Sequence, residues 1–303
     1  MRKFLLLFSI LALAISGCNN GHKHTFTRLV VRDDASWRTY LPGSDFNSDG
    51  LTVFGICSSC KAAALIDYSL SNDTDLQLGQ TSVTIEYGDL SLEYPIQVKE
   101  KLNIACIGDS LTAGHYWANE SYPTKLAGMV DDSYVVKNCG VNGISITGYG
   151  GSWKDPEMRY IKQDVYQESV DFKPDIFAIM LGTNDATEWS KAEPTFKDEY
   201  KILLDSYLEQ FPLAKYIMMV SPPVVSPNQF SIPNDEIRDY VNPIQRELAE
   251  EYGFTALDLR KEFEETPDYQ TKFLRPNDDV HFTAEAAEFV AGRVWDIIKN
   301  YQF

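Results

Sequence analysis

The sequence is poor in basic residues. Its 303 residues include 27 lysines and arginines against 44 aspartates and glutamates, which gives a formal net charge of −17 at pH 7. A surface of this charge repels phosphate groups, which argues against a nucleic-acid partner. It also disfavours polyanionic substrates unless the protein has a local basic pocket. Neutral or weakly charged substrates therefore fit the composition best.

The first segment lacks the length of a membrane span. Arg2 and Lys3 precede an apolar run over residues 4–15, which is too short to cross a bilayer and is typical of an export signal. The run ends in Ile15-Ser16-Gly17-Cys18, which resembles the lipobox of bacterial lipoproteins. This resemblance implies cleavage before Cys18 and lipidation of its thiol, so that acyl chains anchor the protein to a membrane. Asn19 takes the place of the aspartate that implies inner-membrane retention, so we expect an exported lipoprotein of the outer membrane.

Cysteine and histidine are scarce, with five and four residues. The pair Cys57-Ser58-Ser59-Cys60 lacks the second pair that a zinc site needs, and its β-rich surroundings do not suit a thioredoxin-like site. A local disulfide and two free thiols both stay open for this pair. Cys106 and Cys139 lie in apolar segments and are predicted to be buried thiols. His22 and His24 lie in a polar tether without further ligands, so no metal and no cofactor is predicted.

From residue 25 to residue 100 the hydrophobic pattern has a period of two. Alternating runs at 81–87 and 90–98 flank Gly88-Asp89, which predicts a β-hairpin. Earlier strands are predicted at residues 29–31, 51–56 and 63–68. Several short strands at this spacing favour a small all-β sandwich. The stretches 49–53 and 78–88 resemble the bacterial Ig-like domains, so we expect an Ig-like sandwich over residues 25–100.

From residue 101 to residue 303, strand-like and helix-like runs alternate. Strands are predicted at residues 103–107, 134–136, 175–181, 216–220 and 254–257. Helices are predicted at residues 196–211, at 235–252 with a kink or late start at Pro243, and from a cap at Thr283. This alternation predicts an α/β domain with a parallel five-stranded sheet covered on both faces. The expected organisation is a signal over 1–17, a tether over 18–24, the β-domain over 25–100 and this domain over 101–303.

Polar residues follow three of the predicted strands and precede the last helix. They lie in the segments 108–110, 138–143, 182–185 and 278–281. In an open parallel sheet the carboxyl ends of the strands share one edge, where sites form. A serine on a tight turn, glycines that present N–H groups, an amide side chain and an Asp-x-x-His pair would converge there. These are the components of a serine hydrolase.

The same four blocks, in this order, resemble the SGNH hydrolase family, the GDSL-type esterases and lipases. The matching segments are Gly108-Asp109-Ser110-Leu111, Gly143, Gly182-Thr183-Asn184-Asp185, and Asp278 with His281. The resemblance covers about 200 residues. It implies a three-layer, flavodoxin-like fold and a hydrolase that needs neither metal nor organic cofactor.

The resemblance also implies the roles of individual residues. Ser110 would be the nucleophile, His281 the general base, and Asp278 the carboxylate that orients the imidazole. The backbone N–H groups of Ser110 and Gly143 and the side chain of Asn184 would form the oxyanion hole. Each of these residues has a structural alternative when taken singly, such as capping a turn or supplying a positive φ.

Four further residues near these blocks have competing or structural interpretations. Asp279 is a rival to Asp278, although the spacing favours Asp278. His115 is a rival base, but five residues along a continuing helix turn its ring ~140° away from the serine, so it is expected at the pocket rim at most. Asp109 and Asp185 are predicted to bond to nearby backbone.

Aromatic residues on the predicted loops suggest the substrate class. The candidate pocket residues are Trp117, Tyr149, Trp153, Trp189 and the rim residue His115. Such rings suit stacking on sugars, although packing of the loops explains them equally well. We expect a serine esterase that removes short acyl groups, acetyl above all, from carbohydrate. The alternatives are a lipase or thioesterase of the same family, and a non-catalytic glycan-binding or adhesion protein at the cell surface. The sequence does not indicate an oligomeric state.

Overall fold

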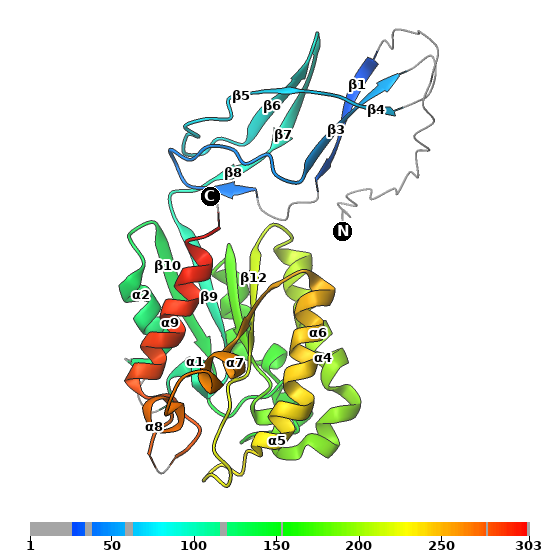
Figure 1. Ribbon diagram of the computed structural model, residues 1–303. Helices are drawn as coiled ribbons and strands as arrows, with labels where there is room; N and C mark the ends of the chain where they lie inside the picture. The colour runs from blue at the N-terminus through cyan, green and yellow to red at the C-terminus, as the bar shows by residue number, and fades with distance from the viewer. Residues whose placement is uncertain are drawn as a thin grey trace. The chain divides into compact units, whose positions relative to one another are not determined.

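The computed structural model describes residues 26–33, 38–57, 63–115, 120–152, 154–276 and 278–301 (Figure 1). The chain divides between Val98 and Lys99 into two compact units. None of the helices in the described ranges has the length and apolar character that a membrane crossing requires. The predicted signal, the tether with Cys18, and the residues Cys60, Trp117 and Trp153 lie outside the described residues.

The first unit consists of short strands. They are β1 (Phe26–Asp33), β2 (Thr39–Tyr40), β3 (Leu51–Cys57), β4 (Ala63–Leu65), β5 (Ser69–Ser71), β6 (Ser82–Tyr87), β7 (Leu90–Pro95) and β8 (Gln97–Val98). β1, β3 and β4 form one antiparallel sheet, β5, β6 and β7 form another, and β2 pairs with β8. The predicted hairpin is confirmed, because β6 and β7 pair around Gly88-Asp89. Alternate residues of β3 and β6, such as Val53, Val83 and Ile85, are fully buried in the core of this unit.

The second unit is built on the parallel sheet that the sequence predicts. Its strands are β9 (Leu102–Gly108), β10 (Tyr134–Gly140), β11 (Ile176–Met180), β12 (Lys215–Val220) and β13 (Thr255–Asp258). They lie in the order β10-β9-β11-β12-β13, and all four pairings are parallel. Every residue of β11 is buried, as expected for a central strand with helices on both faces.

Helices cover the two faces of this sheet and complete three layers (Figure 1). On one face α2 (Tyr122–Met129) packs against α9 (Ala284–Ile298). The other layer contains α3 (Asp164–Asp171), α4 (Trp189–Gln210) and α6 (Asn242–Tyr252). Hydrogen bonds join its neighbours: Ser169 of α3 bonds to Tyr207 of α4 at 2.7 Å, and Lys197 of α4 bonds to Glu247 of α6 at 2.6 Å. The three-layer α/β fold is therefore confirmed.

Two helices differ from their predicted bounds. α4 begins seven residues before the predicted start at residue 196, because a 3₁₀ turn over Asn184–Glu188 leads directly into Trp189. The predicted helix over 235–252 is divided into α5 (Asn234–Glu236), a π-helical turn (Ile237–Val241) and α6. Pro243 lies in the first turn of α6 and has no N–H to donate, so the wider π-helical turn precedes it. The segment is thus helical from Asn234 onward, and the irregularity predicted at Pro243 takes the form of this π-helical turn.

Candidate active site

The register of the sheet brings three of the predicted blocks to one level. Gly108, the last residue of β9, pairs with Gly140 of β10 and with Met180 of β11. The chain leaves all three strands at the same edge, within a few residues of Ser110, Gly143 and Asn184. This edge is where a parallel sheet places its ligands.

Ser110 is the first residue of α1 (Ser110–Ala113), a single helical turn directly after β9. Asp109 caps this turn, because its Oδ1 accepts a hydrogen bond from the Leu111 N–H at 2.9 Å. The turn is tight: a Cβ atom at Gly108 would lie 1.9 Å from Oγ1 of Thr112. Ser110 is therefore fixed at the sheet edge, with 8% of its surface exposed.

Ser110, His281 and Asp278 form one chain of hydrogen bonds. Nε2 of His281 lies 2.8 Å from Oγ of Ser110, and Nδ1 lies 2.8 Å from Oδ2 of Asp278. The other carboxylate oxygen of Asp278 accepts the backbone N–H groups of Val280 and His281 at 2.9 and 2.8 Å. The carboxylate on Nδ1 is thus that of Asp278, while its rival Asp279 has left-handed backbone, with a φ of +62°, and its carbonyl accepts the Val225 N–H.

The charge of Asp278 determines which atoms donate and which accept in these hydrogen bonds. Burial alone would raise the pKa of the Asp278 carboxyl, but the hydrogen bonds from the His281 side chain and backbone outweigh it and lower that pKa. Asp278 is thus an anion that can only accept, so Nδ1 of His281 donates to it. Nε2 is left as an acceptor for the hydroxyl proton of Ser110.

The other two predicted residues meet beside the serine turn. Nδ2 of Asn184 donates to the carbonyl of Ile144 at 2.8 Å, which ties the amide to the residue after Gly143. Gly143 has a φ of +71°, and a Cβ atom there would lie 2.1 Å from Oγ of Ser152. The Val141 N–H donates to the carbonyl of Gly108 at 3.0 Å and joins the same loop to the end of β9. One glycine-rich loop is therefore held between the end of β9 and the turn that carries Asn184.

Two buried aspartates, Asp109 and Asp185, bond to backbone N–H groups of the serine turn and of the glycine-rich loop, as predicted. Asp185 accepts the N–H groups of Ile146 and Thr147, each at 3.0 Å, and the Thr147 hydroxyl at 2.7 Å. Burial raises the pKa of Asp185 to about 6, although these hydrogen bonds oppose the shift. Burial also raises the pKa of Asp109 to about 7; the Leu111 N–H opposes this, and the nearby charge of Asp185 adds to it. Both carboxyls bond to nearby backbone, so the structural interpretation is confirmed.

The expected orientation of His115 is wrong. α1 ends at Ala113, and Gly114 and His115 both have left-handed backbone, with φ values of +85° and +47°. The chain therefore reverses where a continuing helix was assumed. The ring of His115 stacks on the ring of His281 at a centroid distance of 4.0 Å and an interplanar angle of 6°. His115 consequently lies directly against the imidazole that contacts Ser110.

The two predicted aromatic pocket residues that the structure describes differ in exposure. Tyr149 is partly exposed and lies in the glycine-rich loop, next to Gly150, which packs against the backbone of Asn184. Trp189 is only 7% exposed and packs between Phe196 and Tyr240. The ring that faces solvent there is Tyr240, at 46% exposure.

Further residues of the site were not predicted. A small pocket adjoins Ser110 and His281, and its other lining residues are Leu111, Gly114, Glu120, Ser121, Arg275, Phe282 and Ala287. Phe230 also packs on His281, at a centroid distance of 4.8 Å. It follows β12, whose carboxyl end lies at the same sheet edge, and that position is the signal that could have found it. A wider hollow between β13 and the end of α9 contains none of these residues.

Across the residues that the structure describes, no group of three or more His, Cys, Asp and Glu side chains is arranged to hold a metal ion. Cys106 and Cys139 are free, buried thiols, as predicted. Cys57 is buried in β3, while its predicted partner Cys60 lies outside the described residues.

Comparison with known proteins shows the family of this chain. Residues 106–289 match the family model of the GDSL-like lipases and acylhydrolases. An acetylxylan esterase of Xylanibacter ruminicola is 28% identical over 199 residues, which are 57% of this chain and 39% of that protein. The match thus spans well under half of that relative's length.

Solved structures share the fold. A lipase/acylhydrolase from Enterococcus faecalis aligns with a TM-score of 0.50 at 21% identity, covering 65% of this chain and 95% of the other. The aryl esterase of M. smegmatis aligns with a TM-score of 0.51 at 16% identity, covering 65% and 98%. The family model covers more than half of the chain and includes the serine, glycine, asparagine and histidine blocks. The chain belongs to the GDSL-like lipase and acylhydrolase family of carboxylic ester hydrolases.

Proposed function

We propose that this protein hydrolyses short-chain acyl esters, acetyl esters above all, on carbohydrate. The observation that carries the proposal is the hydrogen-bonded chain from Ser110 through His281 to Asp278, with both contacts at 2.8 Å. A serine hydroxyl bonded to the free nitrogen of an imidazole, which a carboxylate holds from behind, is the arrangement that activates an oxygen nucleophile.

The reaction proceeds in two acyl transfers. Nε2 of His281 takes the hydroxyl proton as Oγ of Ser110 bonds to the ester carbonyl carbon. The carbonyl oxygen becomes an oxyanion, which accepts hydrogen bonds from the N–H groups of Ser110 and Gly143 and from the amide of Asn184. His281 then returns the proton to the leaving alcohol, and the carbon–oxygen ester bond breaks. Water repeats the sequence on the acyl-enzyme, which releases the acid and restores the Ser110 hydroxyl.

The lining of the pocket supports a short acyl group and a polar leaving group. Leu111, Gly114 and Ala287 are small or apolar and leave little room beside the serine. Glu120 and Arg275 provide polar groups at the same pocket, which suit a hydroxylated alcohol. The similarity to a protein described as an acetylxylan esterase favours acetylated xylan-type glycans over lipids.

A panel of esters tests the proposal. Purified wild-type protein and Ser110→Ala are compared on p-nitrophenyl acetate, butyrate and longer esters, and on acetylated xylo-oligosaccharides. We expect the wild type to prefer acetyl esters and to release acetate from the oligosaccharides, and Ser110→Ala to be inactive on all of them. A preference for long acyl chains would indicate a lipase. Equal inertness of both proteins, with no acetate released, would favour the non-catalytic glycan-binding alternative.

The cellular location forms part of the proposal. The lipobox-like segment ending at Cys18 and the following Asn19 support an exported lipoprotein of the outer membrane. The β-unit would then be an Ig-like spacer between the anchor and the esterase domain. Metabolic labelling with a radioactive fatty acid tests the anchor: the wild type should incorporate label and Cys18→Ser should not. Equal labelling of the two proteins would contradict it.

A further inference from the structure

Three aromatic rings meet around the acid–base group of the site. His115 covers one face of His281 at 4.0 Å, nearly parallel to it. Phe230 stands perpendicular to both imidazoles, 4.8 Å from His281 and 5.8 Å from His115. These three separations form a triangle with roughly a right angle at His281, so Phe230 lies beside the stack and faces the edge of the ring.

The position of His115 is tied to the nucleophile. The N–H groups of Gly114 and His115 both donate to the carbonyl of Ser110, at 3.0 and 3.1 Å. The left-handed backbone of both residues turns the chain back over the serine. The ring of His115 is thus placed by the same short turn that places the Ser110 hydroxyl.

The loop that carries Phe230 is held by its own hydrogen bonds. Oδ1 of Asn228 accepts the N–H groups of Phe230 and Ile232, each at 3.1 Å. Oγ of Ser226 accepts the Asn234 N–H at 2.9 Å and donates to the carbonyl of Ile232. The Val225 N–H of this loop also donates to the carbonyl of Asp279, the residue between Asp278 and Val280. Phe230 is therefore joined to the segment that carries the acid and the histidine.

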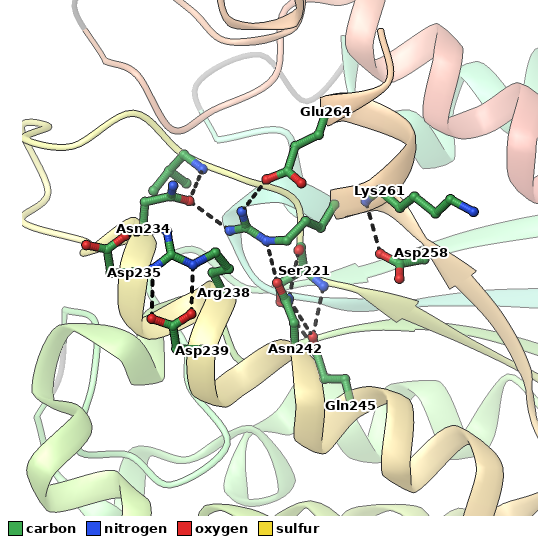
Figure 2. A network of polar contacts seen from close by, with 12 residues as sticks. Ser221, Asn234, Asp235, Arg238, Asp239, Asn242, Gln245, Asp258, Lys261 and Glu264 are labelled. Atoms are coloured by element: carbon green, nitrogen blue, oxygen red, sulfur yellow. Dashed lines mark hydrogen bonds and ion pairs between the residues drawn. The ribbon is translucent and has the colours of Figure 1, made fainter.

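A buried arginine anchors the far end of this loop. Arg260 is 3% exposed, and its guanidinium donates to the side-chain oxygens of Asn234 and Asn242 and to the Glu264 carboxylate, three partners that Figure 2 labels. Asn242 in turn donates to the carbonyl of Ser221, where the loop leaves β12. Buried polar contacts fix both ends of the loop. The loop therefore gives Phe230 a defined position.

The charge of His115 suits a stacking partner rather than a second base. Burial lowers the pKa of His115, and the positive charges of His281 and Arg275 lower it further, while the Asp278 carboxylate and a hydrogen bond with the Asn142 side chain oppose them. His115 is therefore neutral at neutral pH. A neutral ring can stack on His281 in both of its protonation states, whereas a second cation 4.0 Å away would oppose proton uptake.

The two hydrogen bonds of His281 leave one motion open. They fix the positions of Nδ1 and Nε2, but the ring can still tilt about the line that joins these atoms. Tilting would move the Nε2 lone pair out of line with Oγ of Ser110. A flat ring packed on the face of the imidazole blocks that tilt, and a ring against its edge blocks sideways displacement.

We propose that His115 and Phe230 are positioning residues, which hold the imidazole of His281 in the plane where its Nε2 meets the Ser110 hydroxyl. This inference rests on the proposed function, because it concerns the efficiency of the same proton transfer. His115 acts through its flat, neutral ring, not through a titrating nitrogen.

Paired substitutions at residue 115 test this role. His115→Ala removes the stack and should lower kcat on p-nitrophenyl acetate by ~10- to 100-fold with little change in KM, the range expected for small misplacement of a catalytic group. His115→Phe keeps a flat ring without nitrogens and should restore most of that loss. Phe230→Ala should lower kcat in the same way. If His115→Phe is as poor as His115→Ala, or if neither alanine variant lowers kcat, the positioning role is wrong.

A spectroscopic readout separates this inference from the proposed function. In the full chain the His281 Nδ1–H proton, held by Asp278, should give a downfield proton resonance that broadens in His115→Ala and is sharp in His115→Phe. An unchanged resonance in His115→Ala overturns the positioning role even when the wild type is an active esterase. Conversely, if the wild type hydrolyses no ester but the resonance responds as expected, the proposed function fails while the packing role is supported.

Discussion

Replacement of Asp278 by asparagine tests the direction of proton transfer in the site. Asparagine has the same shape, and its oxygen can still accept the backbone N–H groups of Val280 and His281, which now bond to Oδ1 at 2.9 and 2.8 Å. Its NH₂ group then occupies the position of Oδ2, 2.8 Å from Nδ1 of His281. A donor there forces Nδ1 to accept, so the ring proton moves to Nε2.

The consequence is an imidazole of the wrong tautomer. With a proton already on Nε2, His281 cannot take the proton of Ser110, although every atom lies where it did before. Loss of the correct tautomer in a serine triad lowers kcat by ~10⁴, which corresponds to about 5 kcal/mol of transition-state stabilisation. We therefore expect Asp278→Asn to lose ~10⁴ in kcat with nearly unchanged KM.

The assay is hydrolysis of p-nitrophenyl acetate, with thermal unfolding as a check on the fold. Asp279→Asn is the matched control, because Asp279 has a φ of +62°, which asparagine tolerates, and its backbone carbonyl bonds to the Val225 N–H in either variant. We expect this control to stay within about threefold of the wild type. If folded Asp278→Asn retains more than about a tenth of the activity, the assigned direction of proton transfer is refuted.

Two further predictions concern the oxyanion donor and the buried carboxyl beside the serine. Asn184→Ala should lower kcat by ~10²–10³ while KM changes little, because the amide acts on the developing oxyanion; steady-state kinetics on p-nitrophenyl acetate measure this, and a loss confined to KM would show that Asn184 binds substrate only. Asp109→Asn should affect stability in a pH-dependent way: burial raises the folded-state pKa of Asp109 from 3.8 to about 7, so the folded protein holds a proton that the unfolded chain releases between these values. The wild type therefore gains stability from this group as the pH falls from about 7 toward about 4, and the variant does not. In melting curves, the melting temperature of the variant relative to that of the wild type should be higher at about pH 8 than at about pH 5. The same difference at both pH values would contradict the reasoning.

The sequence predicts the parts of the site that depend on strand ends. Parallel strands in register bring their carboxyl ends to one edge whatever the intervening helices do, so the separation of Ser110 from His281 along the chain disappears in the fold. The pattern of buried strands and amphipathic helices suffices to predict this geometry. For the same reason Asn184 and Gly143 could be predicted to lie beside the serine turn.

The parts that depend on the ends of short helices could not be predicted. The orientation of His115 depends on α1 ending after one turn, and in the sequence the glycine at position 114 is a local sign of that ending. Trp189 is the first residue of α4, because a 3₁₀ turn leads directly into the helix there. The helical periodicity at residues 196–211 does not reveal this earlier start. The placement of Phe230 depends on its loop, in which Asn234 bonds to Arg260 and Val225 bonds to Asp279, two residues distant in the sequence. Such contacts leave no periodic pattern in the chain.

Covalent labelling of the full-length protein tests the central claim most directly. The protein is treated with a fluorophosphonate, digested, and mapped by mass spectrometry, with Ser110→Ala and His281→Ala alongside. We expect a single adduct on Oγ of Ser110 in the wild type, no adduct in Ser110→Ala, and greatly slowed labelling in His281→Ala, because the serine then lacks its base. An unlabelled Ser110 in the wild type, or equal labelling of Ser110→Ala, would contradict the account.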